Sequence, residues 1–338
     1  MAERPDLTFV IPNYNGAAYL RETVESLLAQ RDRRFLLILA DNCSTDASVD
    51  MVQSYRDERI SVRLGDRHVS MSENWNRAMG YVDTPYFVLA HADDLYDPEY
   101  LSVVLPLLLA EPNAFVAHCM VHNIDEEGRL LDLPVDAYKA RFYPREDPYC
   151  RRPCDEAAWL RKGNYILAPS AMYRTSLVRE IGPFNPRFQF VPDWEYWLRG
   201  VFAGRQIAGT RRRLVRYRRH ASSLTRAAER NLSRYDEEIE LLEWLAPAGR
   251  AAGCFADASP DYGLVSNTLM SEFTDRLARG DADGAARLST FARQRIPGFR
   301  GSARDLAARA ALPLGVRGGR ALAWGRARAL ELLTWRRA

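Results

Sequence analysis

Acidic side chains follow two apolar runs in the first part of the chain. Asp41 comes directly after the run over residues 35–40, and Asp93 and Asp94 come shortly after the run over 86–90. If these runs are parallel strands, their carboxyl ends share one edge of a sheet, where ligands of such sheets bind. One carboxylate could accept hydrogen bonds from a base or ribose, while another holds Mg²⁺ or Mn²⁺ with substrate phosphates. Taken singly, each group could instead belong to a turn or a helix cap.

A third acidic residue, Asp193, stands at the start of a predicted helix. The helix is indicated by four apolar residues that share one face at helical spacing: Trp194, Trp197, Leu198 and Val201. Asp193 therefore falls in the first turn of this helix, where it could either take part in catalysis or only cap the helix.

Strand and helix signals alternate over the first 110 residues. Short apolar runs predict strands, amphipathic spacing predicts helices, and Ser70 with Glu73 forms a capping-box pattern at one helix start. The predicted strands are 7–11, 35–40, 60–64 and 86–90, and the predicted helices are 18–30, 46–55, 70–82 and 98–109. This order implies a largely parallel sheet covered on both faces. Short strands and loops follow over 114–222, and the elements from 224 onward are helical.

The segment after the first predicted strand, 10–16, carries neither glycine-rich pattern for phosphate binding. Gly-x-Gly-x-x-Gly and Gly-x-x-x-x-Gly-Lys are both missing there, which argues against nicotinamide-dependent dehydrogenases and P-loop kinases. A diphosphate is then expected to be bound through a metal ion.

Composition places the chain among ordinary globular proteins. Of its 338 residues, 47% are hydrophobic and 27% are charged, which excludes a disordered or collagen-like chain. No apolar run reaches the ~18 residues that span a bilayer, and the N-terminus has no signal-peptide pattern. We therefore expect a cytoplasmic protein. The five cysteines are scattered without zinc spacing, which predicts reduced thiols.

The net charge of +3 conceals an uneven distribution. From residue 284 onward there are 12 Arg and no Lys, against two acidic residues, so this segment carries +10. A GC-rich genome and selection for an anionic partner both explain such arginine richness, and the basic end is where that partner is sought.

Four segments, taken in order, resemble family 2 glycosyltransferases with the GT-A fold. The resemblance spans about 1–222, and the segments are Val-Ile-Pro-Asn-Tyr-Asn at 10–15, Asp-Asn-Cys-Ser-Thr-Asp at 41–46, Asn-Trp-Asn-Arg-Ala at 74–78 and His-Ala-Asp-Asp-Leu-Tyr-Asp-Pro at 91–98. It implies inverting transfer of a sugar from a nucleotide-diphosphate donor, assisted by Mg²⁺ or Mn²⁺. Any one segment is a weak signal, but their order makes the resemblance specific.

The resemblance also implies roles for residues of these segments. Pro12 and Tyr14 would line the base pocket, Asp41 would accept from a uracil or thymine ring, Asp93 would approach the ribose, and Asp94 would bind the metal. Asn15 and Asn76 are further candidates for binding the nucleotide sugar. At the metal site this chain departs from many relatives, because His91 stands where they carry Asp and the metal keeps fewer carboxylates.

On the acceptor side, Asp193 resembles the family's catalytic base. Inversion requires a base that takes the hydroxyl proton while oxygen attacks the anomeric carbon. Pro192 replaces a frequent Glu of the family, and Glu195 is the second candidate for the base.

Near the end of this region, His220 resembles a residue of the family's strand-to-loop segment. Its imidazole could ligate Mn²⁺ or pair with phosphate, and Arg218 and Arg219 would add charge for the departing diphosphate. A solvated basic strand end is the alternative.

We thus expect a GT-A catalytic domain at 1–223, with a nucleotide-binding half at 1–110 and an acceptor-binding half at 111–223. A helical region at 224–338, basic from 284, follows it. The expected function is glycosyl transfer in bacterial surface polysaccharide or glycolipid biosynthesis, with a glycan or lipid-linked acceptor and no nucleic-acid partner. An inactive nucleotide-sugar-binding or scaffold protein and a sugar-phosphate nucleotidyltransferase are the alternatives.

The basic C-terminus suggests peripheral association with the inner face of the cell membrane. Trp324 and Trp335 lie about three helical turns apart with Arg328 between them, and tryptophan with arginine suits a headgroup interface. Codon bias and an oligomer contact are the competing explanations.

Overall fold

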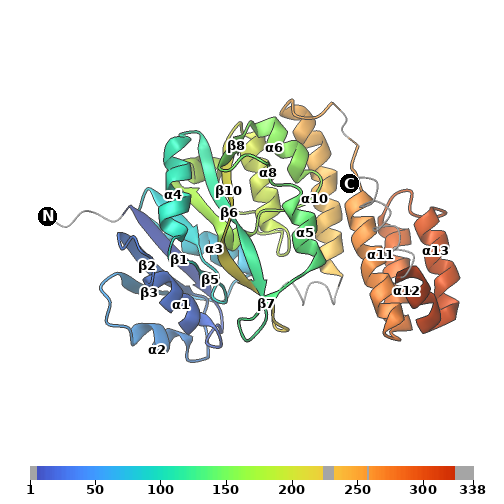
Figure 1. Cartoon of the computed structure of the whole chain (residues 1–338), viewed down its shortest axis with the longest axis horizontal. Coiled ribbons are helices and arrows are strands. Elements are labelled where there is room, and N and C mark those ends of the chain that lie inside the picture. Colours follow the sequence, from blue (N-terminus) through green and yellow to red (C-terminus); the bar gives the residue numbers. More distant parts are fainter. Residues whose placement is uncertain (1–5, 224–231, 257–258, 324–338) are drawn as a thin grey trace. The chain divides into compact units, whose positions relative to one another are not determined.

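A computed structural model describes residues 6–223, 232–256 and 259–323 (Figure 1). These residues form two compact units. The first comprises residues 6–223 with 247–256, and the second comprises 232–246 with 259–323.

A mixed sheet of ten strands forms the centre of the first unit. Its parallel part has the order β3-β2-β1-β4, and these strands are β1 (Leu7–Asn13), β2 (Phe35–Asp41), β3 (Ile60–Leu64) and β4 (Tyr86–Leu89). The sheet continues in the order β9-β6-β10-β5, with β7 beside β6 and β8 beside β10. These strands are β5 (Leu95–Tyr96), β6 (Ala114–Ile124), β7 (Leu130–Leu131), β8 (Tyr149–Arg151), β9 (Ala171–Arg174) and β10 (Gln206–Arg218).

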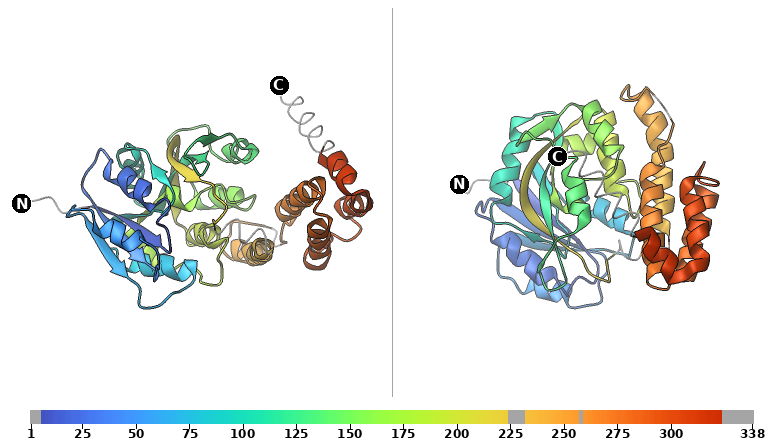
Figure 2. Two further views of the ribbon diagram at one scale, coloured as in Figure 1. Left: turned by 90° about the horizontal axis from the view of Figure 1, so that it is seen from below. Right: turned by 45° about the vertical axis from the view of Figure 1, so that its right-hand side comes forward.

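Helices pack on both faces of this sheet (Figures 1 and 2). Those on one face share a core with Phe9 and Ile11 of β1, and they are α1 (Leu20–Leu28), α2 (Ser48–Gln53) and α4 (Tyr100–Ala110). Val10, between those two residues, is also fully buried, as expected for a strand covered on both sides. On the other face lie α3 (Met71–Gly80), α7 (Thr175–Ile181) and α8 (Pro192–Phe202). The remaining short helices of the unit are α5 (Pro134–Ala140), α6 (Pro153–Leu160) and η1 (Ala168–Ser170).

The sequence-based fold class is confirmed, including several local signals. Ser70 and Glu73 form the predicted capping box at the start of α3, with the Ser70 side chain accepting from the Glu73 N–H and the Glu73 carboxylate accepting from the Ser70 N–H. Asp193 lies in the first turn of α8 as predicted. The parallel strands agree with prediction to within two residues at each end.

All secondary-structure elements in the described part of the second unit are helices. It contains α11 (Gly263–Ala278), α12 (Ala282–Arg295), α13 (Ala303–Ala311), η2 (Leu312–Leu314) and the first part of α10 (Ser233–Ala251). Leu269, Phe273 and Leu277 of α11 are buried, as is Leu288 of α12, and these two helices pack together. Trp324, Arg328 and Trp335 lie outside the described residues.

One expectation about the cysteines is wrong. Cys154, on α6, forms a disulfide with Cys254, 100 residues later, within the first unit. Cys43, Cys119 and Cys150 are free thiols.

Candidate active site

The first two strands end together at the carboxyl edge of the sheet. Asn13 and Asp41 are paired in the last position of the β1–β2 register, and the Asn13 amide donates to Asp41 Oδ1 at 2.9 Å. Ser44 donates to both oxygens of Asp41, through its hydroxyl to Oδ1 and its N–H to Oδ2. Asp41 is thus held by three hydrogen bonds within the protein and is 2% exposed, and its predicted contact with a base stays a prediction.

Asn15 fastens the loop after β1 to the loop after β2. Its side-chain oxygen accepts from the Thr45 N–H at 2.8 Å, and its own N–H donates to Ser44 Oγ at 2.9 Å. The positive φ of Asn15, 51°, is a backbone conformation that Asn tolerates better than most residues. In this arrangement Asn15 shapes the site, and its predicted contact with the nucleotide sugar stays a prediction.

Tyr14, next to Asn15, is the most exposed aromatic side chain of this edge. It is 52% exposed, and its ring lies 4.3 Å from that of His68, centroid to centroid. His68 is itself held by the carbonyl oxygen of Asn42, 3.2 Å from its Nδ1. Tyr14 is therefore open to solvent at the edge of the sheet, Pro12 is half-buried two residues before it, and their predicted role in a base pocket stays a prediction. Sequence spacing had given His68 no role.

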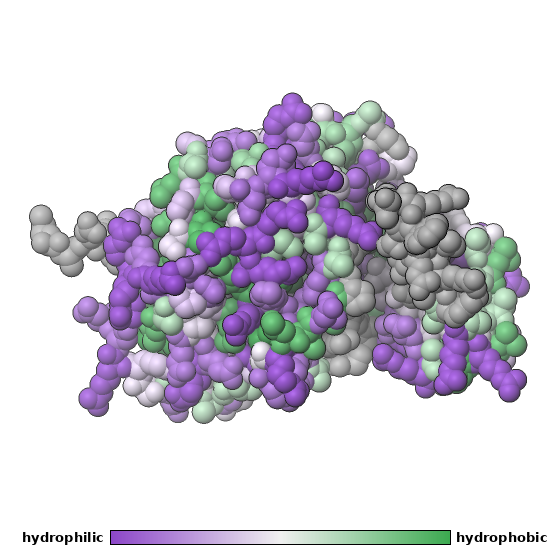
Figure 3. Space-filling model, in the orientation of Figure 1, coloured by the Kyte–Doolittle hydropathy of each residue, from purple (hydrophilic) through white to green (hydrophobic). Residues whose placement is uncertain are grey.

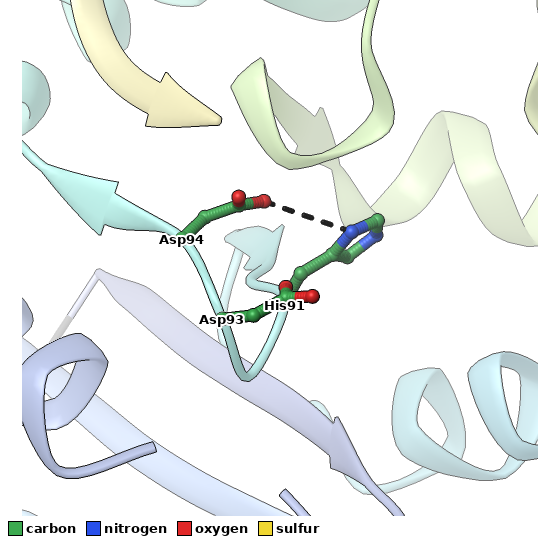
Figure 4. Close-up of side chains that lie close together, drawn as sticks. All are labelled: His91, Asp93 and Asp94. Atoms are coloured by element: carbon green, nitrogen blue, oxygen red, sulfur yellow. Dashed lines mark ion pairs between the residues drawn. The ribbon is translucent and has the colours of Figure 1, made fainter. Parts of the chain in front are cut away.

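The loop after β4 brings His91, Asp93 and Asp94 together (Figure 4). A nitrogen of His91 and one oxygen of each carboxylate lie within 4.8 Å of one another. Asp94 Oδ1 accepts from the main-chain N–H of Arg218 at 2.8 Å, whereas the buried Oδ2 has no hydrogen-bond partner among the described residues. Burial, and then the neighbouring Asp93, raise the pKa of Asp94 well above its usual range. A divalent cation suits these donors and would satisfy the unpaired oxygen.

His220 lies beside this loop and contacts Asp93. Its Nε2 is 2.9 Å from Asp93 Oδ2, and its Nδ1 is 2.8 Å from Ser222 Oγ. The structure thus brings His220 to the predicted acidic pair, although both ring nitrogens are engaged by protein atoms.

Arg218 is buried and its side chain is bonded within the protein, which argues against its expected role beside a diphosphate. Its side chain is 2% exposed and donates to the carbonyl oxygens of Asp93 and Glu126, at 2.9 and 2.8 Å, and to the Glu22 carboxylate at 2.6 Å. The guanidinium also lies over the Tyr19 ring. Arg218 is therefore neither solvated, which was the alternative from sequence, nor free for a ligand, and it supports the acidic loop from inside the protein.

Asn76 uses its side chain to hold another segment. Its oxygen accepts from the Phe184 N–H, and its amide donates to the Phe184 carbonyl, both at 2.8 Å. This exchange fastens α3 to the chain between α7 and α8. Asn76 keeps one amide N–H for its predicted contact with the nucleotide sugar.

Asp193 lies in a setting that suits a proton acceptor. Its Oδ2 accepts from the Asn164 amide at 3.0 Å, and its Oδ1 accepts from the Trp194 N–H at 2.8 Å. Burial raises the pKa of Asp193 to about 6, against the lowering influence of Asn164 and the positive charge of Lys139. A base works best when its pKa lies near the operating pH. No pattern in the sequence had singled out Asn164.

Glu195, the second candidate for the base, is occupied by an ion pair. It is 4% exposed and accepts from Arg199 at 2.9 and 3.1 Å. Arg199 also donates to the carbonyl oxygens of Ile181 and Pro183. Glu195 therefore helps to fasten α8 to the preceding loop.

A mixed sheet with a parallel half, an acidic loop at its carboxyl edge and a second carboxylate on α8 defines a GT-A-type fold. S. aureus TarS residues 1–349, solved in complex with UDP-GlcNAc, match with a TM-score of 0.61 at 16% identity, over 93% of this chain and 92% of that one. The sequence profile of glycosyl transferase family 2 matches residues 8–182. The chain belongs to this family.

Two curated relatives cover shorter stretches of the chain. The uncharacterized protein y4gI of Sinorhizobium fredii is 31% identical over 201 residues, which are 58% of this chain and 20% of that protein. The putative teichuronic acid biosynthesis glycosyltransferase TuaG of Bacillus subtilis is 29% identical over 142 residues, 41% of this chain and 56% of TuaG. The chain thus spans about a fifth of the length of y4gI and about half of the length of TuaG. Among the described residues, no helix is both long and apolar enough to cross a membrane.

Proposed function

We propose that the protein is an inverting glycosyltransferase that moves a sugar from a nucleotide-diphosphate donor to a hydroxyl acceptor. The proposal is carried by the position and the pKa of Asp193. This carboxylate lies in the first turn of α8, beside the GT-A sheet, and burial raises its pKa to about 6. Membership of glycosyl transferase family 2 supports the same reaction class.

In the proposed reaction, Asp193 accepts the proton of the acceptor hydroxyl as its oxygen bonds to the anomeric carbon. The bond from that carbon to the diphosphate oxygen breaks on the opposite face, so the configuration inverts and a nucleoside diphosphate leaves. Asn164 holds the carboxylate of Asp193 by a hydrogen bond and favours its ionised, proton-accepting form.

The donor is proposed to bind at the carboxyl edge of the parallel strands. In this proposal Pro12 and Tyr14 contact the base, Asp41 accepts a hydrogen bond from it, and Asp93 approaches the ribose. Asp94 is the proposed anchor of Mg²⁺ or Mn²⁺, and its unpaired Oδ2 supports that role. Such a cation, when bound, offsets the negative charge that develops on the diphosphate leaving group.

We further propose that the acceptor belongs to bacterial surface polysaccharide or glycolipid assembly, as the name of TuaG suggests for that relative. A glycan or a lipid-linked glycan is the proposed acceptor class. The donor sugar is open, and UDP- and GDP-linked sugars are the first to test.

The test is a screen of nucleotide sugars that measures the free nucleoside diphosphate with Mg²⁺ or Mn²⁺ present. Release that depends on an added acceptor supports the transferase. Release of pyrophosphate from a nucleoside triphosphate and a sugar phosphate would support a nucleotidyltransferase instead. Donor binding without any product would support the inactive binding protein.

The second unit is proposed to bind an anionic membrane surface. Within it, three exposed apolar side chains lie close in sequence to exposed arginines, and these residues are Leu306, Leu314, Val316, Arg309, Arg317 and Arg320. Figure 3 shows hydrophilic and hydrophobic residues together on the described surface of this unit. Apolar groups beside arginine suit a headgroup region, and a lipid-linked acceptor would give this location a purpose.

A further inference from the structure

His91 is placed to share a cation with Asp94. Its Nδ1 lies 3.7 Å from Asp94 Oδ2, which is too far for a hydrogen bond. Two ligands on one cation can be separated by at most twice the ligand distance, about 4.2 Å for bonds of about 2.1 Å. The observed separation meets this limit. Figure 4 shows the Asp94 carboxylate directed toward the imidazole ring.

Both side chains also have buried polar atoms that the protein leaves unpaired. Among the described residues, Asp94 Oδ2 and His91 Nε2 have no hydrogen-bond partner. Buried groups without partners are uncommon because they lose their hydration without compensation. The Trp75 ring packs 5.3 Å from the His91 ring and restricts its orientation. Of these atoms, Asp94 Oδ2 is the one that faces His91 Nδ1, and its lack of a partner fits an oxygen that is held ready for a cation.

His220 is less suited to the same task. Its Nε2 is bonded to Asp93 and its Nδ1 to Ser222, so each ring nitrogen is in use. His91 has one nitrogen facing Asp94 and another without a partner.

We propose that His91 supplies a nitrogen ligand to the divalent cation that Asp94 anchors, and that this ligand shifts the metal preference away from Mg²⁺. The proposal rests on the proposed metal-assisted function. Magnesium favours oxygen ligands, whereas imidazole binds more strongly to transition metals in the order Mn²⁺, Co²⁺, Ni²⁺. A carboxylate at position 91 would restore an all-oxygen set of protein ligands.

Pulsed electron paramagnetic resonance of Mn²⁺ tests this assignment directly. Full-length protein is loaded with Mn²⁺ and UDP, or Mn²⁺ and GDP, and examined for coupling of the metal to ¹⁴N of an imidazole. Wild-type protein should show the coupling, and protein grown with ¹⁵N-histidine should show the corresponding ¹⁵N signal. This isotopic comparison needs no substitution, so it does not depend on whether a variant folds.

Substitutions then identify the histidine. The coupling should disappear in His91→Asp and persist in His220→Asn, with bound Mn²⁺ verified in each sample. Bound Mn²⁺ without nitrogen coupling in wild-type protein would overturn the proposal, as would coupling that survives His91→Asp. Either result would leave sugar transfer untouched, since transfer is measured separately by nucleoside diphosphate release.

Metal selectivity gives a second measurement. Competition between Co²⁺ and Mg²⁺ for the UDP-loaded protein should show the Co²⁺ preference falling at least about tenfold in His91→Asp, because even residues that only support a metal ligand have effects of this size. An unchanged ratio would contradict the assignment.

Discussion

The main-chain N–H of Arg218 donates to Asp94 Oδ1 at 2.8 Å, and the Arg218 side chain donates to the carbonyl oxygen of Asp93 at 2.9 Å. The end of β10 thereby holds the loop after β4 at two points. Oδ1 of Asp94 is thereby engaged with the protein, whereas Oδ2 has no hydrogen-bond partner among the described residues, so Oδ2 is the oxygen that we expect to meet a cation.

Replacing Arg218 should destabilise the protein. Arg218→Met keeps much of the side-chain volume but leaves the carbonyl oxygens of Asp93 and Glu126 without their charged donor. We expect the free energy of unfolding to fall by at least about 2 kcal/mol, measured by urea denaturation. Arg216→Met, at an exposed position of the same strand, is the control and should change it by less than about 0.5 kcal/mol. Equal effects of the two variants would contradict the supporting role.

Asp193→Asn should abolish the proton-accepting group while preserving shape. We expect kcat to fall about 10²–10⁴-fold, as is typical for a lost general base, with donor affinity unchanged. Calorimetry of donor binding and nucleoside diphosphate release measure the two quantities. Loss of affinity with normal turnover of bound donor would instead make Asp193 a binding residue.

The activity should depend on pH through Asp193. Its pKa is raised to about 6 chiefly by burial, and only the ionised carboxylate can accept a proton. The rate should therefore fall as pH drops through about 6, in a profile measured with saturating substrates.

The same setting affects stability. The pKa of Asp193 is higher in the folded protein than in the unfolded chain, so the protonated carboxyl stabilises the fold. This contribution to the free energy of unfolding is fully present below about pH 4 and is lost as pH rises through about 6.

Asn164→Ala should shift the profile of rate against pH to higher pH. Asn164 donates to Oδ2 of Asp193, which stabilises the ionised form, so its removal should raise the pKa of the carboxyl. The acidic limb of the rate profile should move to higher pH. A lower rate with an unmoved limb would show that Asn164 acts only on structure.

Asp94→Ala should remove metal-dependent donor binding. The substitution deletes the oxygen proposed to anchor the cation, so added Mn²⁺ should no longer tighten donor binding in titration calorimetry. Asp83→Ala is the matched control, because Asp83 is 92% exposed on the surface of the same unit. Wild-type turnover that is unaffected by EDTA would contradict a metal role.

Vesicle sedimentation should test the basic helical unit. Each basic residue near an anionic leaflet contributes about 1 kcal/mol, so Arg309→Gln, Arg317→Gln and Arg320→Gln together should weaken binding to anionic vesicles roughly 100-fold. Deletion of 316–338 should reduce it as well. Vesicles of neutral lipid are the control. Equal, negligible binding to both kinds of vesicle would remove the membrane proposal.

Local signals in the sequence determined the parallel half of the sheet and the position of its acidic residues. Apolar runs fixed the strands that precede Asp41 and Asp94, and the Ser70–Glu73 pair marked the start of α3. These features depend on neighbours within a few residues, so periodicity and capping rules reach them. The helical start that carries Asp193 was predictable for the same reason.

Only the tertiary structure decided how these groups are used. The bond between Arg218 and Asp94 joins residues 124 positions apart, and the Cys154–Cys254 disulfide spans 100. The Asn164 side chain that holds Asp193 likewise comes from a segment 29 residues away. The sequence around an arginine does not indicate whether its side chain is solvated or buried. Its role depends on which carbonyl groups the folded chain brings to it, and that placement is set by packing of distant segments rather than by local spacing.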